Sequence, residues 1–180
     1  MAVLNVNPTR MELTRLKKQL STALRGHKLL KDKRDELMRQ FLDMIRETKT
    51  LREEVEERLK SVNNDFVLAS SVMSKEELDT ALLAPKQEVY LEASTRNVMS
   101  VDIPVYSFKT RTSEQSDIFS YGFASTSFEL DDAVSGLSDL LPKMLKLAEM
   151  EKSVKLMADE IEKTRRRVNA LEHVMIPRYQ

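Results

Sequence analysis

The sequence predicts an all-α-dominated fold: a long antiparallel two-helix coiled coil with a short helix and a small β-hairpin insert between its helices. Apolar residues recur at alternating three- and four-residue spacing through two long segments, residues 13–62 and 137–175. The composition also favours helix, because 32% of residues are charged and there are only 3 glycines and 5 prolines. Hydrophobic residues reach 41% but aromatic residues only 6%, which suits aliphatic seams between helices.

The first long helix is expected over residues 8–72. Pro8 suits a first helical turn, and Thr9 with Glu12 can form a capping box. A pattern kept for about seven heptads predicts supercoiling and extends about 75 Å at 1.5 Å per residue. The expected seam positions are Leu13, Leu16, Leu20, Ala23, His27, Leu30, Arg34, Leu37, Phe41, Met44, Thr48, Leu51, Val55, Arg58 and Val62.

A second group of apolar residues lies beside this seam and widens the apolar stripe. A wider stripe favours contact with a third element or with another protein. These residues are Leu24, Leu29, Met38, Leu42, Ile45 and Leu59.

The insert is expected over residues 73–126 and begins with a short helix. Ser74 and Glu77 have the spacing of a capping box, and the helix should end near Pro85. The connection over residues 110–127 is rich in Ser, Thr, Gly and Asp, so we expect a mobile segment there.

Two strand-like runs, residues 88–94 and 97–106, follow the short helix. They contain Val, Ile and Tyr with partial alternation, which predicts a hairpin that turns near Thr95 and Arg96. Pro104 would then lie on an edge of the sheet.

The second long helix is expected over residues 127–180, with Thr126 and Glu129 as a further capping box. Pro142 should kink this helix or begin a new one. Two amphipathic helices separated by an insert bury their stripes by turning back on each other, so the pair should be antiparallel. The expected seam positions are Leu137, Leu140, Met144, Leu147, Met150, Val154, Met157, Ile161, Thr164, Val168, Leu171 and Met175.

Several function classes lack their sequence signals. Lys+Arg and Asp+Glu balance at 29 each, which disfavours a general nucleic-acid binder, and zero cysteines exclude thiolate chemistry. No glycine-rich phosphate loop is present, and the two histidines, His27 and His173, form no metal-binding spacing. We therefore expect no catalytic site, cofactor or metal, no direct membrane insertion, and a cytoplasmic location.

Two basic clusters are the candidate partner-binding residues: Lys28, Lys31, Lys33 and Arg34, and Arg165, Arg166 and Arg167. Three successive arginines on a helix spread over about 200°, so they present cations around a shaft rather than along one seam. The alternative interpretation is ordinary surface charge that keeps the chain soluble. Gly26, inside the first helix, permits close packing or slight bending, or is merely tolerated there.

Several segments resemble the D subunit family of the V-type/A-type (archaeal or vacuolar-type) ATP synthases, whose members form part of the central stalk of the prokaryotic V-ATPase. The specific segments are NVNPTR at residues 5–10, GHKLLKDKRDEL at 26–37 and EIEKTRRRVNALE at 160–172. Looser resemblance covers NVMSV at 97–101 and LLPKMLKLAE at 140–149. Members of this family usually continue past the position of Pro177, so we expect the C-terminal helix to continue beyond residue 180.

The resemblance implies a non-catalytic rotor that couples ATP chemistry to ion transport. The ends of its coiled coil would enter the head of A and B catalytic subunits, with the two basic clusters facing its inner surface. The F subunit would bind the shaft, and the other end would meet the C/d-type subunit that caps the membrane ring. The hairpin region, residues 89–106, would belong to the stalk end or to its modulatory surface. The complex would hold the chain at the cytoplasmic face of the membrane. Proton or sodium coupling, the direction of the reaction and the shaft face that binds the F subunit stay open.

An alternative from another class is a prefoldin-like or tethering coiled-coil module. Prefoldin also places hairpin strands between helices, although its chains are shorter and its helices do not resemble the segments above.

Overall fold

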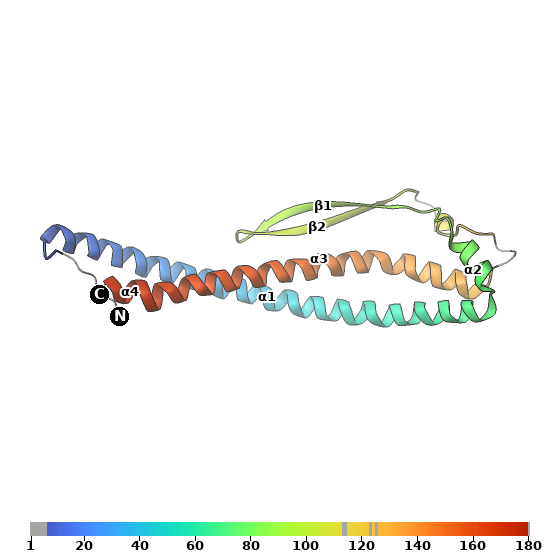
Figure 1. Cartoon of the computed structure of the whole chain (residues 1–180), viewed down its shortest axis with the longest axis horizontal. Helices are drawn as coiled ribbons and strands as arrows, with labels where there is room; N and C mark the ends of the chain where they lie inside the picture. The colour runs from blue at the N-terminus through green and yellow to red at the C-terminus, as the bar shows by residue number, and fades with distance from the viewer. Residues whose placement is uncertain (1–6, 113–114, 123, 125, 180) are drawn as a thin grey trace. The chain divides into compact units, whose positions relative to one another are not determined.

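The computed structural model describes residues 7–112, 115–122, 124 and 126–179, which belong to two compact units. The first unit comprises residues 1–44, 99–101 and 154–180, and the second comprises residues 45–98 and 102–153. Asn5, Val6 and Gln180, and positions 113, 114, 123 and 125 of the predicted connection, lie outside the described residues. The elements in chain order are α1 (Arg10–Val72), α2 (Lys75–Leu82), β1 (Val89–Val98), β2 (Val101–Thr110), the 3-10 turn η1 (Gln115–Ile118), α3 (Phe128–Ala170), the π-helical turn η2 (Leu171–Met175) and α4 (Ile176–Tyr179) (Figure 1).

Helix α1 pairs with α3 in an antiparallel sense in both units. In the second unit Arg52 forms an ion pair with Glu151, and Glu54 forms one with Lys143. In the first unit Lys33 pairs with Glu160. Residues later in α1 thus pair with residues earlier in α3, as in an antiparallel pair. The predicted fold class, dominated by helices and carrying a two-stranded hairpin, is confirmed.

One of the three predicted capping boxes, Ser74 with Glu77, is complete. At Thr9 and Glu12 only one of its two bonds forms, because the Thr9 amide donates to the Asn7 carbonyl instead. The Glu77 amide donates to Ser74 Oγ at 3.2 Å, and the Ser74 amide donates to Glu77 Oε2 at 3.0 Å, which completes the box of α2. The hydrogen bonds from the Ser74 amide and hydroxyl lower the pKa of Glu77. At α1 the Glu12 amide donates to Thr9 Oγ1 at 3.3 Å.

The third predicted box, Thr126 with Glu129, is wrong. Helix α3 begins at Phe128, one residue later than this box requires, and the Thr126 hydroxyl instead donates to the Gly122 carbonyl at 3.2 Å. Ser127 directly precedes the helix, and its buried Oγ has no hydrogen-bond partner in the described part of the chain.

Helix α3 passes through Pro142 without ending, so no new helix begins there. Pro177, the second proline of the predicted helix, changes the helix more than Pro142 does. In η2, the Ile176 amide donates to the Leu171 carbonyl, a bond that spans five residues. Pro177 has no amide hydrogen and its ring crowds the carbonyl four residues earlier, so a widened turn before it relieves the clash. The expected continuous helix is therefore divided into α3, η2 and α4.

The hairpin turns at Met99 and Ser100, so the predicted turn at Thr95 and Arg96 is wrong: these two residues lie inside β1. Met99 and Ser100 have positive φ angles of 51° and 71°. A two-residue hairpin turn of type I′ requires positive φ at both central residues, and Gly, Asn or Asp usually supply it. Since neither position carries such a residue, the sequence contains no recognisable turn signal.

The turn fixes the register of the strands. The Arg111 amide donates to the Glu88 carbonyl at 2.9 Å just beyond the strands, so these two residues form a hydrogen-bonded pair. Hydrogen-bonded pairs then alternate along the ladder, and Pro104 occupies a position whose amide side faces outward. The missing amide hydrogen of Pro104 costs the ladder no bond, as predicted for an edge position.

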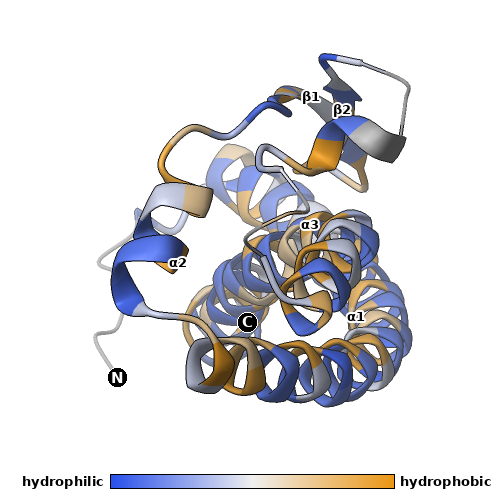
Figure 2. Cartoon of the chain, turned by 90° about the vertical axis from the view of Figure 1, so that its right-hand side faces the viewer, coloured by the Kyte–Doolittle hydropathy of each residue, from blue (hydrophilic) through white to orange (hydrophobic). Residues whose placement is uncertain are grey.

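The buried side chains follow the predicted seams closely. Figure 2 shows alternating hydrophobic and hydrophilic bands along α1 and α3, as amphipathic helices require. Five predicted seam positions are wrong because their side chains are exposed. They are Leu13, Arg58, Leu137, Met144 and Met175.

Gly136 lies where α1 and α3 come close together in the second unit. A Cβ atom built on Gly136 would lie 2.8 Å from Val62 Cγ2, closer than real Cβ contacts. Gly26, by contrast, has nothing within 4 Å of its Cβ position. Close helix packing therefore depends on Gly136 and not on Gly26.

Candidate functional site

Contacts within the first unit show which parts of α1 and α3 lie side by side, and therefore where along the helix pair the predicted basic residues lie. Lys33 Nζ lies 3.4 Å from Glu160 Oε1, and His27 Nε2 lies 3.4 Å from Glu172 Oε2. Residues 27–33 of α1 therefore lie beside residues 160–172 of α3 and η2. The two basic clusters, far apart in sequence, are brought to the same level of the helix pair.

Three of the seven predicted residues have acidic partners within the chain. Lys33 is half-buried and pairs with Glu160 across the two helices, whereas Arg34 pairs with the neighbouring Asp35 at 2.7 Å. Arg166 pairs with Glu162 one turn earlier on α3. The charges of these three cations are already partly compensated.

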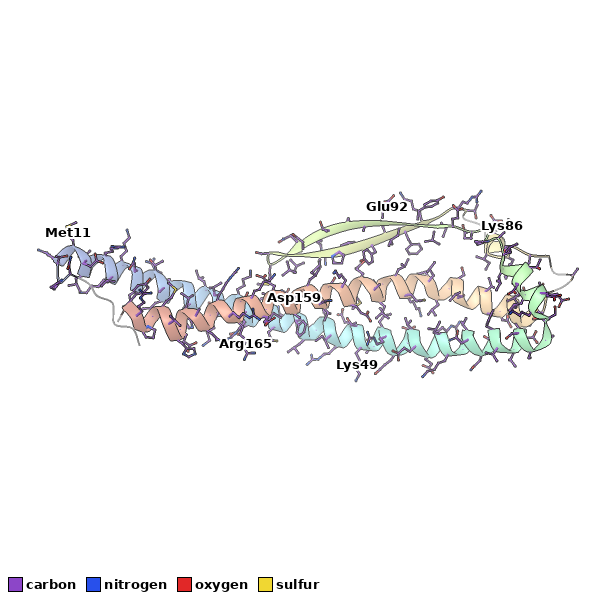
Figure 3. All side chains as sticks on the ribbon, viewed as in Figure 1. Met11, Lys49, Lys86, Glu92, Asp159 and Arg165 are labelled. Atoms are coloured by element: carbon purple, nitrogen blue, oxygen red, sulfur yellow. The ribbon has the colours of Figure 1, made fainter. Side chains whose placement is uncertain are left out.

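The other four predicted residues are exposed and form no ion pair with the described residues: Lys28, Lys31, Arg165 and Arg167. Lys28 and Lys31 are three residues apart and share one side of α1. Arg165 and Arg167 lie on either side of α3, about 200° apart. Figure 3 shows Arg165 extending from the helix pair. We call these four residues the cationic belt.

The cationic belt can bind carboxylates of a partner protein. Arginine offers a rigid fork of donors that fits a carboxylate with two hydrogen bonds, and lysine adds a mobile point charge. The attraction acts over roughly 8–10 Å at physiological salt. Among the described residues no group of three or more His, Cys, Asp or Glu side chains could hold a metal ion.

Exposed apolar side chains form a second candidate surface, on α1. Of the six residues predicted to widen the stripe, Leu59 is half-buried and the other five are exposed: Leu24, Leu29, Met38, Leu42 and Ile45. In the first unit, Leu24, Met38 and Leu42 fall on one side of the helix by the 100° rotation per residue. We call these three residues the apolar strip.

Glu149 positions the hairpin on α3 and was not singled out from the sequence. Its Oε2 accepts a hydrogen bond from the Tyr106 amide at 2.9 Å, and its Oε1 accepts one from Lys146 Nζ at 2.7 Å. Burial raises the pKa of Glu149, but these hydrogen bonds and the charges of Lys146 and Arg96 outweigh it and hold the pKa below its ordinary value. The carboxylate therefore stays ionised and ties β2 to α3 in the second unit.

No described helix combines the length and the apolar character that crossing a bilayer would require.

Comparisons with known proteins agree over nearly the whole chain. The family model described as the D subunit of ATP synthase matches residues 12–180. The V-type ATP synthase D subunit of Acetivibrio thermocellus is 64% identical over 177 residues, which cover 98% of this chain and 80% of that protein. The corresponding proteins of Clostridioides difficile and Clostridium novyi are 62% and 56% identical, covering 99% and 100% of this chain and 80% and 84% of theirs. These matches favour the expected family over the prefoldin-like alternative, and the chain belongs to the D subunit family of ATP synthases.

Proposed function

We propose that this ATP synthase component is a non-catalytic rotor shaft, which couples ATP hydrolysis or synthesis in a head of A and B subunits to proton or sodium transport by rotation. The observation that carries the proposal is the antiparallel pairing of α1 with α3, held by buried seams and by ion pairs between the helices in each unit.

Torque transmission requires an element that resists twisting. Two helices with interlocked side chains resist it better than one helix, because rotation of one helix must drag the other. In the first unit Leu37, Met157 and Val168 are almost completely buried, and in the second unit Leu130 and Leu140 are. Each unit therefore has a packed seam of its own.

The cationic belt supports a contact with the head. Charges that rotate past acidic residues on the inner surface of a ring would favour one conformation of each catalytic site after another. The side chains of Lys28, Lys31, Arg165 and Arg167 can make that contact, because the chain does not use them in ion pairs within its described part.

The apolar strip supports a contact with a partner that is not part of the head. We propose the F subunit as its occupant, and a C/d-type ring-capping subunit as the partner at the other end of the shaft. Through these partners the chain would be held at the cytoplasmic face of the membrane.

Charge reversal of the arginines tests the proposal. In a reconstituted complex, the double variant Arg165→Glu and Arg167→Glu should reduce assembly with the head, or the number of ions transported per ATP. Its helicity, measured by circular dichroism, should stay unchanged because both side chains are exposed. The matched control, Lys60→Glu with Lys152→Glu, reverses two exposed cations outside the proposed contacts and should behave as the unaltered chain. Normal assembly and coupling in both variants would exclude the proposed contact.

A further inference from the structure

The hairpin has one covered edge and one open edge. Along the outer edge of β2, Pro104 has no amide hydrogen, and the Tyr106 amide donates to Glu149 of α3 at 2.9 Å. Because α3 reaches the outer edge of β2, β2 lies between β1 and α3 in the second unit, as Figure 1 shows. The outer edge of β2 is therefore closed to a further strand.

The register of the hairpin determines which backbone groups of β1 face outward. The Glu88 carbonyl accepts from the Arg111 amide at 2.9 Å, and the side chain of Asn97 donates to that of Asp102, opposite it, at 2.7 Å. Both contacts fit one register, in which the even-numbered residues of β1 bond to β2 and the odd-numbered residues direct their amides and carbonyls away from it. Within the described part of the chain β1 has no strand neighbour except β2, so four residues present unpaired backbone groups: Val89, Leu91, Ala93 and Thr95.

The open edge of β1 lacks the features with which proteins usually protect an edge strand. Its ten residues, VYLEASTRNV, contain no proline, glycine or lysine, and all of them except Val98 are exposed. Only an extended backbone offers donors and acceptors at the same two-residue spacing. The group that fits this edge is therefore another β-strand.

The charges of β1 favour a second copy of β1 as that strand. In antiparallel pairing centred on Ser94, the odd-numbered residues of the two copies bond to each other, and the even-numbered residues form the closely spaced pairs without hydrogen bonds. Glu92 then lies opposite Arg96 of the second copy, and two-fold symmetry repeats this pair. A shift of two residues in either direction separates both pairs, so opposite charges specify this register.

Both charged side chains are free to make these pairs. Glu92 and Arg96 are exposed, and the ion pair of Glu92 with Lys109 at 3.0 Å is solvated enough to cost little if it is exchanged. The two β2 strands would lie about 14 Å apart at about 4.8 Å per strand, and each α3 lies beyond its own β2. Since packed helices need only about 8–10 Å between axes, the two copies of α3 have room.

We propose that two copies of this chain associate through antiparallel pairing of their β1 strands, with the two-fold axis at Ser94 and two ion pairs of Glu92 with Arg96. One strand pair is small beside a standard interface of about 1,600 Å², so the association is weak and requires a concentrated solution of the free chain. This surface is separate from the cationic belt and the apolar strip, and its pairing does not depend on rotor function.

Disulfide trapping tests the register, because the chain contains no cysteine of its own. At the two-fold axis the Cα atoms of residue 94 in the two copies would lie about 4.5 Å apart, within the range of a disulfide. In Leu91→Cys, an exposed control on the same strand, the two thiols would be six residues apart along the paired strands, about 20 Å. Under mild oxidation of the full chain, Ser94→Cys should form a covalent dimer roughly tenfold faster than Leu91→Cys or more.

Charge exchange tests the ion pairs by sedimentation equilibrium. Glu92→Arg places like charges opposite each other and should shift the chain towards monomer, whereas adding Arg96→Glu restores opposite charges and should restore the dimer. Glu57→Arg, at an exposed position on α1, makes the same charge change away from the hairpin and should leave association unchanged. Protection of the Tyr106 amide from exchange verifies that the hairpin stays folded in each variant.

Three outcomes would overturn the proposal: equal oxidation rates of the two cysteine variants, a chain that stays monomeric at every concentration, or a charge exchange that fails to restore association lost in Glu92→Arg. None of these readouts uses ATP turnover or another subunit, so failure of this proposal is distinguishable from failure of the rotor proposal.

Discussion

Replacing Gly136 with alanine measures how closely α1 and α3 pack in the second unit. Alanine in place of glycine inside a helix stabilises by about 1 kcal/mol. At Gly136 the added methyl group would lie 2.8 Å from Val62 Cγ2, a branched side chain that moves little, and such overpacking costs about 1–3 kcal/mol. Taking the middle of that range, we expect Gly136→Ala to destabilise the chain by about 1 kcal/mol.

Gly26→Ala is the matched control, because it adds the same methyl group where nothing lies within 4 Å. Only the helix-propensity gain remains there, so it should stabilise by about 1 kcal/mol, and the two variants should differ by about 2 kcal/mol. Thermal unfolding followed by far-UV circular dichroism can resolve this, since about 1 kcal/mol shifts the midpoint by roughly 2–4 °C in a chain of this size.

The double variant Gly136→Ala with Val62→Ala identifies the contact responsible. If the clash with Val62 is the cause, the effects of the two changes will not add, because the smaller side chain makes room for the new methyl group. Equal stabilisation by Gly136→Ala and Gly26→Ala would refute the reasoning and show that the helices are not in tight contact at Gly136.

Two further predictions concern buried polar groups. The hydroxyl of Thr164 is fully buried and has no hydrogen-bond partner in the described chain, so Thr164→Val should raise the free energy of unfolding in urea by about 1 kcal/mol. Thr164→Ser keeps the hydroxyl and loses the methyl group, so it should destabilise the chain. Stabilisation by serine would contradict this reasoning. Glu149→Gln should loosen the hairpin and speed amide exchange at Tyr106. Because the folded-state pKa of Glu149 is depressed, its contribution is present above the unfolded pKa, near 4.3, and is lost as pH falls through the folded value. The protection of the Tyr106 amide, its exchange rate relative to the intrinsic rate at the same pH, should therefore fall as the pH drops through the folded pKa of Glu149 in the unaltered chain and should change much less in Glu149→Gln; an identical pH response would argue against the contact.

The helical seams were predictable because burial on a helix repeats with a nearly fixed period. Leu37, Val55, Leu140 and Val168 are buried at predicted positions. Errors arise where the choice between a three- and a four-residue step decides the face: Arg58 is exposed while its neighbour Leu59 is half-buried. Sequence spacing alone does not fix that step, because 3.6 residues per turn matches neither alternative.

The hairpin was harder to predict because only the start of β2 is buried. Val101 and Ile103 are buried with the exposed Asp102 between them, but residues 107–110 and most of β1 are exposed, so alternation gives little signal there. A turn formed by Met99 and Ser100 carries no glycine to mark it.

The candidate site was predictable as a set of residues but not as a set of contacts. The sequence identifies the cations, and the antiparallel pairing brings the two clusters to one level. Whether Arg166 is paired and Arg165 is not depends on the neighbouring Glu162 and on side-chain conformation. Glu149 could not be found from sequence pattern, because its partner is a backbone amide 43 residues away.

A reversible cross-link between this chain and the catalytic head tests the rotor proposal most directly. The chain contains no cysteine, so Lys31→Cys introduces a unique thiol in the cationic belt, to be paired with a cysteine on the facing surface of the head. The account predicts that ATP turnover by the reconstituted complex stops when the disulfide forms and recovers when it is reduced. Turnover that continues at its full rate with the disulfide intact would contradict rotation of this chain within the head.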